Sequence, residues 1–102
     1  MMTYQRLGTS GLSVSTVGLG CNNLGRAGTT SESQEGTDAV VHAAIDAGIT
    51  LFDVADMYGK APGVSEVQLG RALGSRRDDV VLATKFGLDI DRKSGSAGMP
   101  RP

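Results

Sequence analysis

The sequence predicts an α/β fold in which parallel strands alternate with helices. Short apolar runs occur at 16–20, 50–54 and 80–84, and two segments with helical periodicity lie between them, at 33–47 and 65–73. Strands that alternate with helices along a chain form parallel sheets with right-handed crossovers. The three runs are therefore expected to lie side by side in one sheet.

The amino-terminal segment 4–14 is predicted to be a β-hairpin. Two short runs flank the four residues Gly-Thr-Ser-Gly at 8–11, and four-residue turns of this composition connect antiparallel strands. The strand predicted at 16–20 follows directly. It leads into a segment at 22–33 that is rich in Asn, Gly, Thr and Ser and is predicted to be a loop.

The first helix is predicted over 33–47. Ser31 and Gln34 have the spacing of a capping box, in which each side chain satisfies a free N–H group at the start of a helix. Gly48 is placed where a helix ends in a residue of positive φ. The apolar face of this helix consists of Val40, Val41, Ala44 and Ile45.

The remaining strands and the second helix follow the same logic. The runs 50–54 and 80–84 are nearly all apolar, which is typical of strands covered on both faces. A second helix is predicted over 65–73, because Ser65 and Gln68 repeat the capping-box spacing ahead of an apolar periodicity.

Composition and charge exclude several classes of function. The chain has 102 residues and a formal net charge of −1, without the basic stripe that nucleic-acid binding requires. No segment approaches the roughly 18 apolar residues of a membrane span, and the amino terminus lacks a signal-peptide pattern. One Cys and one His predict neither a disulfide framework nor a metal site, and suit a reducing cytoplasm.

The glycines at 18 and 20 raise the possibility of a Rossmann fold. That fingerprint needs a third Gly or Ala at position 23, with a helix beginning at once. Position 23 is Asn, and the predicted helix begins about ten residues later, which argues against it. The competing architecture is a (β/α)8 barrel, whose active-site groups follow the carboxyl ends of strands. Asp53 and Lys85 both occupy such positions.

Three polar residues are expected to meet at that edge of the sheet. Asp53 ends one apolar run, Lys85 ends the next, and Tyr58 lies five residues after Asp53. Adjacent strands are about 4.8 Å apart, so an Asp–Lys contact across them is geometrically natural. A free phenol has a pKa near 10, and a nearby ammonium lowers the pKa of a phenol toward the range useful for proton transfer. This combination indicates an oxidoreductase that acts on carbonyls.

Five motifs follow one another between residue 4 and about residue 88. They are Arg6-Leu7-Gly8-x-Ser10-Gly11-Leu12-x-Val14-Ser15, Gly18-Leu19-Gly20-Cys21, Phe52-Asp53-x-Ala55-x-x-Tyr58-Gly59, Ser65-Glu66-x-x-Leu69-Gly70-x-Ala72-Leu73 and Thr84-Lys85. In these motifs the chain resembles the amino-terminal third of an aldo-keto reductase, in the branch that resembles potassium-channel β-subunits and bacterial oxidoreductases. Val54 is a departure, since many relatives have Thr there.

The resemblance implies a reaction and a role for each matched residue. Tyr58 would be the general acid that protonates a carbonyl oxygen while NADPH delivers hydride to the carbon. Lys85 would tune the phenol. Asp53 would hold the lysine and contact the cofactor near the nicotinamide ribose. The substrate would be a small aldehyde or ketone. The loop bordering the cofactor would include Gly20, Cys21 and Asn22.

The resemblance also implies that the chain holds about three of eight βα units, as one partial barrel domain over 1–102 with an open loop at 88–102. The family's catalytic His is expected further downstream, because His42 falls in the middle of a predicted helix. The fragment alone is therefore expected to be inactive. Two alternatives stay open: an NADPH-binding partner subunit of the channel-β type without catalysis, and an inactive truncated gene product. Individually, Asp53 could cap a turn and Lys85 could simply extend to water.

Overall fold

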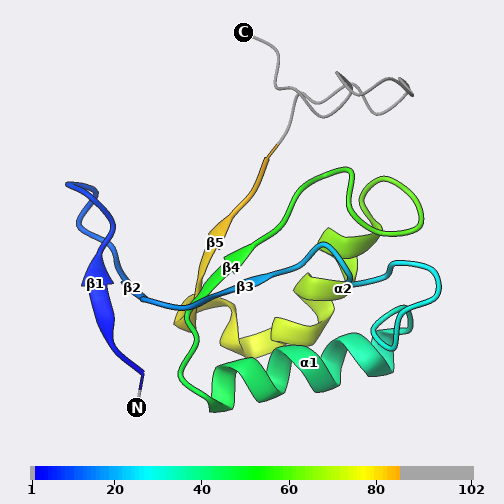
Figure 1. The fold of residues 1–102 in the computed structure, drawn as a ribbon, viewed down its shortest axis with the longest axis horizontal. Helices are drawn as coiled ribbons and strands as arrows, with labels where there is room; N and C mark the ends of the chain where they lie inside the picture. The colour runs from blue at the N-terminus through cyan, green and yellow to red at the C-terminus, as the bar shows by residue number, and fades with distance from the viewer. Residues whose placement is uncertain (1, 86–102) are drawn as a thin grey trace, which may run out of the picture.

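The computed structural model describes residues 2–85, which form a parallel sheet, an antiparallel hairpin and two α-helices (Figure 1). The predicted α/β class is confirmed, as are the hairpin and the parallel sheet. The loop predicted at 88–102 lies outside the described residues. The elements are β1 (Tyr4–Arg6), β2 (Ser13–Ser15), β3 (Gly18–Gly20), α1 (Gln34–Asp46), β4 (Leu51–Asp53), α2 (Val64–Leu73), a 3-10 helix η1 (Gly74–Asp79) and β5 (Val81–Ala83).

The sheet has the strand order β3-β4-β5, with all neighbours parallel. Its register places Gly20 opposite Asp53, and Asp53 opposite Ala83. Each strand is shorter than its apolar run. At the start of β4 the reason is visible, because Thr50 exchanges two hydrogen bonds of 2.9 Å with Ser15, each backbone N–H donating to the other side chain's hydroxyl oxygen.

The hairpin lies beside the amino-terminal ends of the parallel strands, away from the edge where they finish (Figure 1). Its turn closes through the Leu7 N–H, which donates to the Leu12 carbonyl at 2.8 Å. The Tyr4 hydroxyl ties it to the rest of the chain by donating to the Gly48 carbonyl at 2.8 Å. The hairpin therefore supports the sheet from the end opposite the candidate site.

The predicted cap of the first helix is wrong. Ser33, and not Ser31, is the N-cap of α1, and its hydroxyl oxygen accepts a bond of 3.0 Å from the Gly36 N–H. The Ser31 hydroxyl instead donates to the Asn23 carbonyl at 2.8 Å, inside the loop that precedes the helix. Only the residue immediately before the first helical turn can reach the free N–H groups there, so the two-residue difference changes the role of Ser31.

The second predicted capping box is also wrong. Gly63 is the N-cap of α2 and makes no side-chain cap bond, so Ser65 already lies within the first turn. Both residues of the supposed box are buried and bond to distant segments. The Ser65 hydroxyl donates to the Cys21 carbonyl at 2.9 Å, and Gln68 Nε2 donates to the Glu32 carbonyl at 3.1 Å.

The ends of both helices agree with prediction. Gly48 follows α1 with a φ of +95°, and Gly74 follows α2 with a φ of +49°. The 3-10 helix η1, which begins at Gly74, is not predicted by the sequence. It is polar and has no buried residue, so it carries no apolar periodicity that could have indicated it.

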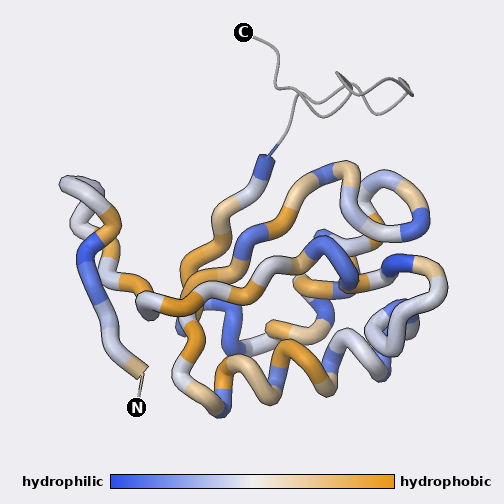
Figure 2. The backbone as a smooth tube through the Cα atoms, viewed as in Figure 1, coloured by the Kyte–Doolittle hydropathy of each residue, from blue (hydrophilic) through white to orange (hydrophobic). Residues whose placement is uncertain are grey.

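A single cluster of buried side chains joins the sheet to both helices, which pack against each other. Figure 2 shows hydrophobic segments along the three parallel strands and polar segments in the loops. Phe52, in the central strand, is fully buried. None of the helices within residues 2–85 is long and apolar enough to cross a membrane. The buried cluster consists of Cys21, Leu24, Val41, Ala44, Phe52, Val54, Leu69, Ala72, Leu73 and Val80.

A buried polar network fixes the loop after β3 against both helices. Gln68 Nε2 donates to Thr37 Oγ1 at 3.0 Å as well as to the loop carbonyl of Glu32. Thr37 Oγ1 in turn donates to the Ser31 carbonyl at 2.9 Å, and Gln34 Nε2 donates to the Gln68 carbonyl at 2.9 Å. Burying a polar group is unfavourable unless it is hydrogen-bonded, and these four bonds reduce that cost. The network therefore defines the path of the loop that leaves the candidate site.

Two glycines of this loop allow a test of how tightly it packs. Gly25 and Gly28 have φ values of +73° and +83°. A Cβ at Gly25 would overlap the Gln68 amide and lie 2.6 Å from Val64 Cγ1, whereas a Cβ at Gly28 would meet nothing within 4 Å. Gly28→Ala is expected to lower the free energy of unfolding by about 1 kcal/mol, from backbone strain alone. Gly25→Ala should cost about 1–3 kcal/mol more, from overpacking.

Urea unfolding followed by circular dichroism measures both costs. Equal costs for the two variants would mean that the loop does not pack on α2 as described.

Candidate active site

The carboxyl ends of the three parallel strands lie together at one edge of the sheet. The ladder continues one residue past the paired positions. There the Cys21 N–H donates to the Asp53 carbonyl, and the Val54 N–H donates to the Ala83 carbonyl, both at 2.8 Å. The backbone of Asp53 is thus held on both sides. Side chains at the ends of these strands are therefore attached to a backbone whose position is fixed by hydrogen bonds.

The ion pair between Asp53 and Lys85 forms at this edge, as predicted from the sequence. Lys85 Nζ donates to Asp53 Oδ1. The register explains the contact, because Ala83 lies opposite Asp53 and residues two apart on a strand share a face. Lys85 therefore emerges on the side of Asp53. The two side chains are 44% and 53% exposed, so the pair adds little to stability and remains accessible to a ligand.

Tyr58 completes the group of three. Lys85 Nζ lies 5.3 Å from the centroid of the Tyr58 ring, within the roughly 6 Å range of a cation–π contact. The phenol ring is half-buried against the hydrophobic core. The loop that carries it is tied to the lysine's own backbone, because the Asp56 N–H donates to the Lys85 carbonyl at 3.2 Å. All three residues predicted to meet are therefore neighbours.

The electrostatics of the site favour a charged lysine. The hydrogen bond to Asp53 is the main cause that raises the pKa of Lys85 above its ordinary value of 10.5. Partial burial opposes this effect, and the neighbouring phenol of Tyr58 adds to it. Lys85 is consequently an ammonium throughout the neutral range. Next to a phenol, such a group stabilises negative charge on the oxygen.

The three residues predicted on the cofactor-binding loop have different surroundings. Gly20 and Asn22 are exposed, and a Cβ at Gly20 would meet nothing within 4 Å. Cys21 is fully buried, and its thiol donates to the Leu19 carbonyl at 3.7 Å. A fully buried side chain has no surface to offer a ligand, so its burial argues against the predicted cofactor contact of Cys21. Burial, reinforced by the charge of Asp53, raises the pKa of the Cys21 thiol to about 11.

The exposed groups at the strand ends fit the polar part of a nucleotide cofactor. The half-exposed Asp53 carboxylate can accept hydrogen bonds from sugar hydroxyls, and the Asn22 amide can both donate and accept. The open space beside Gly20 lets a ligand approach the backbone closely. Within residues 2–85, no cluster of His, Cys, Asp and Glu could hold a metal ion.

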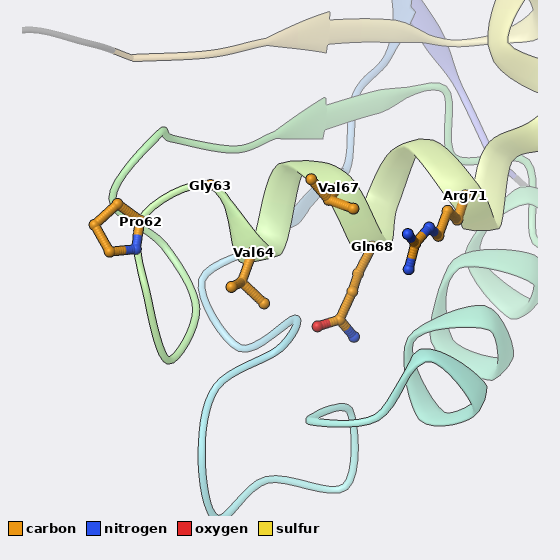
Figure 3. Close-up of a pocket in the computed structure, with 6 residues that line it drawn as sticks. All are labelled: Pro62, Gly63, Val64, Val67, Gln68 and Arg71. Carbon is orange, nitrogen blue, oxygen red and sulfur yellow. The ribbon is translucent and has the colours of Figure 1, made fainter.

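Two surface pockets lie elsewhere. The larger of the two, of about 330 Å³, lies along α2 and the residues just before it, and is lined by Pro62, Gly63, Val64, Val67, Gln68 and Arg71 (Figure 3). The second, of about 260 Å³, is lined by residues of α2 and η1 and of the segments around β4 and β5. Neither contains Asp53, Tyr58 or Lys85. His42 is also remote, because its Nε2 lies 2.9 Å from the Ala72 carbonyl oxygen at the end of α2.

The ion pair yields a direct prediction. Asp53→Asn is expected to lower the pKa of Lys85 toward 10.5, because the main cause of its raised pKa is removed. Glu32→Gln is the matched control, since it removes the carboxylate 3.8 Å from Lys60 Nζ and leaves the strand ends unchanged. NMR titration of ¹³C-methylated lysines reports each amine separately. A Lys85 titration that is the same in both variants would contradict the pairing.

The buried thiol yields a second prediction. The pKa of Cys21 rises from 9.0 to about 11, so at pH 8 the folded chain holds about 100-fold less reactive thiolate than the unfolded chain. The unfolded chain loses its thiol proton first, so stability should fall as the pH rises from about 9 to about 11. The rate of reaction with a disulfide reagent, with and without guanidinium, tests this. Equal rates would show that Cys21 is accessible.

Comparison with known proteins agrees with this geometry. Residues 16–100 match the model of the aldo/keto reductase family. The Bacillus subtilis (strain 168) protein named "Uncharacterized oxidoreductase YqkF" is 41% identical over 97 residues, which cover 95% of this chain and 28% of that protein.

Solved structures give the same result. The aldo-keto reductase AKR11C1 from Bacillus halodurans, in a holo form, superimposes with a TM-score of 0.75 at 34% identity, over 93% of this chain and 29% of that one. The glycerol dehydrogenase AKR11B4 from Gluconobacter oxydans gives 0.64 at 35% identity, over 83% and 25%. The chain thus spans between a quarter and a third of the length of these relatives. It belongs to the aldo/keto reductase family of oxidoreductases and corresponds to the amino-terminal part of that fold.

Proposed function

We propose that this chain carries the proton donor of an NADPH-dependent reductase that converts small aldehydes or ketones to alcohols. The observation that carries the proposal is the convergence of Asp53, Tyr58 and Lys85 at one sheet edge. There the lysine bonds the carboxylate and lies 5.3 Å from the phenol ring centroid. Membership of an oxidoreductase family supports it.

Each of the three side chains has a distinct role in the proposed reaction. The Tyr58 hydroxyl donates its proton to the carbonyl oxygen of the substrate. The Lys85 ammonium stabilises the negative charge that develops on the phenol oxygen as the proton leaves. Asp53 holds the ammonium in place through its carboxylate. When bound, NADPH supplies the hydride for the carbonyl carbon.

The cofactor side of the site is proposed to consist of Gly20, Asn22 and Asp53. All three are exposed at the strand ends, where a ribose and a carboxamide would find hydrogen-bonding partners. The relative from Bacillus halodurans is described as a holo form, and the one from Gluconobacter oxydans is named a glycerol dehydrogenase. The first description supports a bound cofactor, and the second supports a substrate class of small alcohols and carbonyls.

The whole protein is proposed to be a (β/α)8 barrel in which β3, β4 and β5 are the first three strands. The parallel order of these strands and the helices between them support this, as does the share of the relatives that the chain covers. In such a barrel the remaining catalytic groups, including the expected His, would follow later strands. The isolated 102-residue chain is therefore expected not to turn over substrate.

The role of Tyr58 can be tested in a complete barrel. Residues 4–85 would replace the matching segment of the Bacillus subtilis relative, and NADPH oxidation would be followed with an aromatic aldehyde. Tyr58→Phe is expected to lower kcat/KM by at least about 100-fold, because general acid catalysis contributes about that much. Tyr4→Phe is the matched control. It removes the other tyrosine hydroxyl of this chain, which bonds Gly48, and should leave the rate within about twofold.

A Tyr58→Phe chimera as active as the Tyr4→Phe chimera would refute the proposed proton donor. Turnover by the isolated chain above its own Tyr58→Phe variant would refute the expectation that the barrel must be complete.

A further inference from the structure

The loop that carries Tyr58 is anchored by a residue outside the proposed catalytic group. We propose that Ser65 is a positioning residue that fixes Tyr58 relative to the Asp53–Lys85 pair. The inference rests on the proposed function, since it gives Ser65 importance through Tyr58. It also predicts the position of the Tyr58 ring relative to Lys85, which can be measured without catalytic turnover.

Ser65 bonds both segments that flank the site. Its hydroxyl donates to the Cys21 carbonyl at 2.9 Å, at the end of β3. Its backbone N–H donates to the Tyr58 carbonyl at 3.2 Å. The residue is fully buried. One residue in the first turn of α2 thus joins the two segments, through its side chain to the proposed cofactor loop and through its backbone to the proposed proton donor.

Packing alone does not explain why a hydroxyl group is buried at this position. Burying a hydroxyl is unfavourable unless it is bonded, and an apolar residue would fill a core site without that demand. Helix capping does not supply the reason, because α2 already begins after Gly63. The hydrogen bond to the Cys21 carbonyl explains the buried hydroxyl. Removing the hydroxyl would leave that buried carbonyl without this donor.

The loop lies against the start of α2 with little free space. A Cβ at Gly59, where φ is +103°, would be 2.9 Å from Val64 Cβ and 3.0 Å from the Ser65 backbone nitrogen. The Lys60 N–H also donates to the Gly25 carbonyl at 2.9 Å. The backbone after Tyr58 is therefore seated directly on the turn that contains Ser65.

These bonds connect Tyr58 to the ion pair by a path through Ser65. The Tyr58 carbonyl accepts from Ser65, the Ser65 hydroxyl donates to Cys21, and the Cys21 N–H donates to the Asp53 carbonyl at 2.8 Å. On the other side, the Asp56 N–H donates to the Lys85 carbonyl. The backbone that carries the phenol is held by both connections. Removing the Ser65 hydroxyl keeps the backbone bond from Ser65 to Tyr58 but releases the first turn of α2 from the end of β3, so the ring should shift relative to the ammonium.

The composition of the chain makes this measurable. It contains two tyrosines and no tryptophan, so 3-fluorotyrosine labelling gives two ¹⁹F NMR signals, with Tyr4 as the internal reference. Lys85→Met should shift the Tyr58 signal, because it removes the ammonium 5.3 Å from the ring centroid. In the full 102-residue chain carrying Ser65→Ala, that Lys85-dependent shift is expected to fall to less than half.

The matched control is Ser15→Ala. Ser15 is 1% exposed, and its hydroxyl donates to the Val17 carbonyl at 2.6 Å and accepts from the Thr50 N–H at 2.9 Å, at the opposite end of the sheet. This variant should leave the Lys85-dependent shift of Tyr58 unchanged. Equal shifts in the Ser65→Ala and Ser15→Ala chains would overturn the inference, as would the absence of any Lys85-dependent shift in the unsubstituted chain.

A conservative variant covers the case in which Ser65→Ala also disturbs the Tyr4 signal through loss of the fold. Ser65→Thr keeps the hydroxyl donor and is expected to restore the Lys85-dependent shift of Tyr58. A Ser65→Thr chain that gives dispersed signals but no such shift would overturn the inference.

The chimeric barrel separates this inference from the proposed function. A Tyr58→Phe chimera as active as the Tyr4→Phe chimera, with the Ser65 result as expected, counts against the proposed function alone. A large loss of activity in the Tyr58→Phe chimera, with the Lys85 dependence of Tyr58 kept in the Ser65→Ala chain, overturns the role of Ser65 alone.

Discussion

The parallel register of β3, β4 and β5 is the constraint on which the candidate site depends. Gly20, Asp53 and Ala83 are aligned across the sheet, and backbone bonds on both sides hold Asp53 in the middle. Side chains that follow the strands at this edge therefore lie close to one another. Since strand residues two apart share a face, the register alone directs Lys85 toward Asp53. A shift of one residue in either strand would reverse this arrangement.

Around this frame, the site is assembled mostly by backbone hydrogen bonds from loops. The segment after β4 bonds the backbone of Lys85 on one side and that of Ser65 on the other, and the loop after β3 is fixed by a buried network from Gln68 and Thr37. The Asp53–Lys85 pair is half-exposed and adds little to stability. Its importance lies in charge, because it keeps an ammonium beside a phenol at a surface open to a ligand.

The sequence predicted the features that depend on hydrophobic periodicity and strand ends. These include the parallel sheet, both helices, and the meeting of Asp53 with Lys85 and Tyr58. It failed where several hydroxyls compete for one role. Ser31 and Ser33 both precede α1 at a spacing that would allow capping. The Ser31 hydroxyl bonds the Asn23 carbonyl in the folded chain, and this leaves Ser33 as the cap. The cap predicted at Ser65 is wrong because the hydroxyl bonds Cys21, which lies 44 residues away in the sequence. Likewise, the burial of Cys21 follows from packing against both helices, which no local pattern encodes.

The most direct test of the account is whether Lys85 and Tyr58 are neighbours in solution. In the labelled 102-residue chain, a nuclear Overhauser effect between the ε protons of Lys85 and the ring protons of Tyr58 is the predicted result. The Tyr4 ring and the α protons of Gly48 supply an internal positive control, since the Tyr4 hydroxyl bonds the Gly48 carbonyl. If the control signal is present and the Lys85–Tyr58 signal is absent, the strand ends do not assemble the site described, and the proposed proton donor loses its basis.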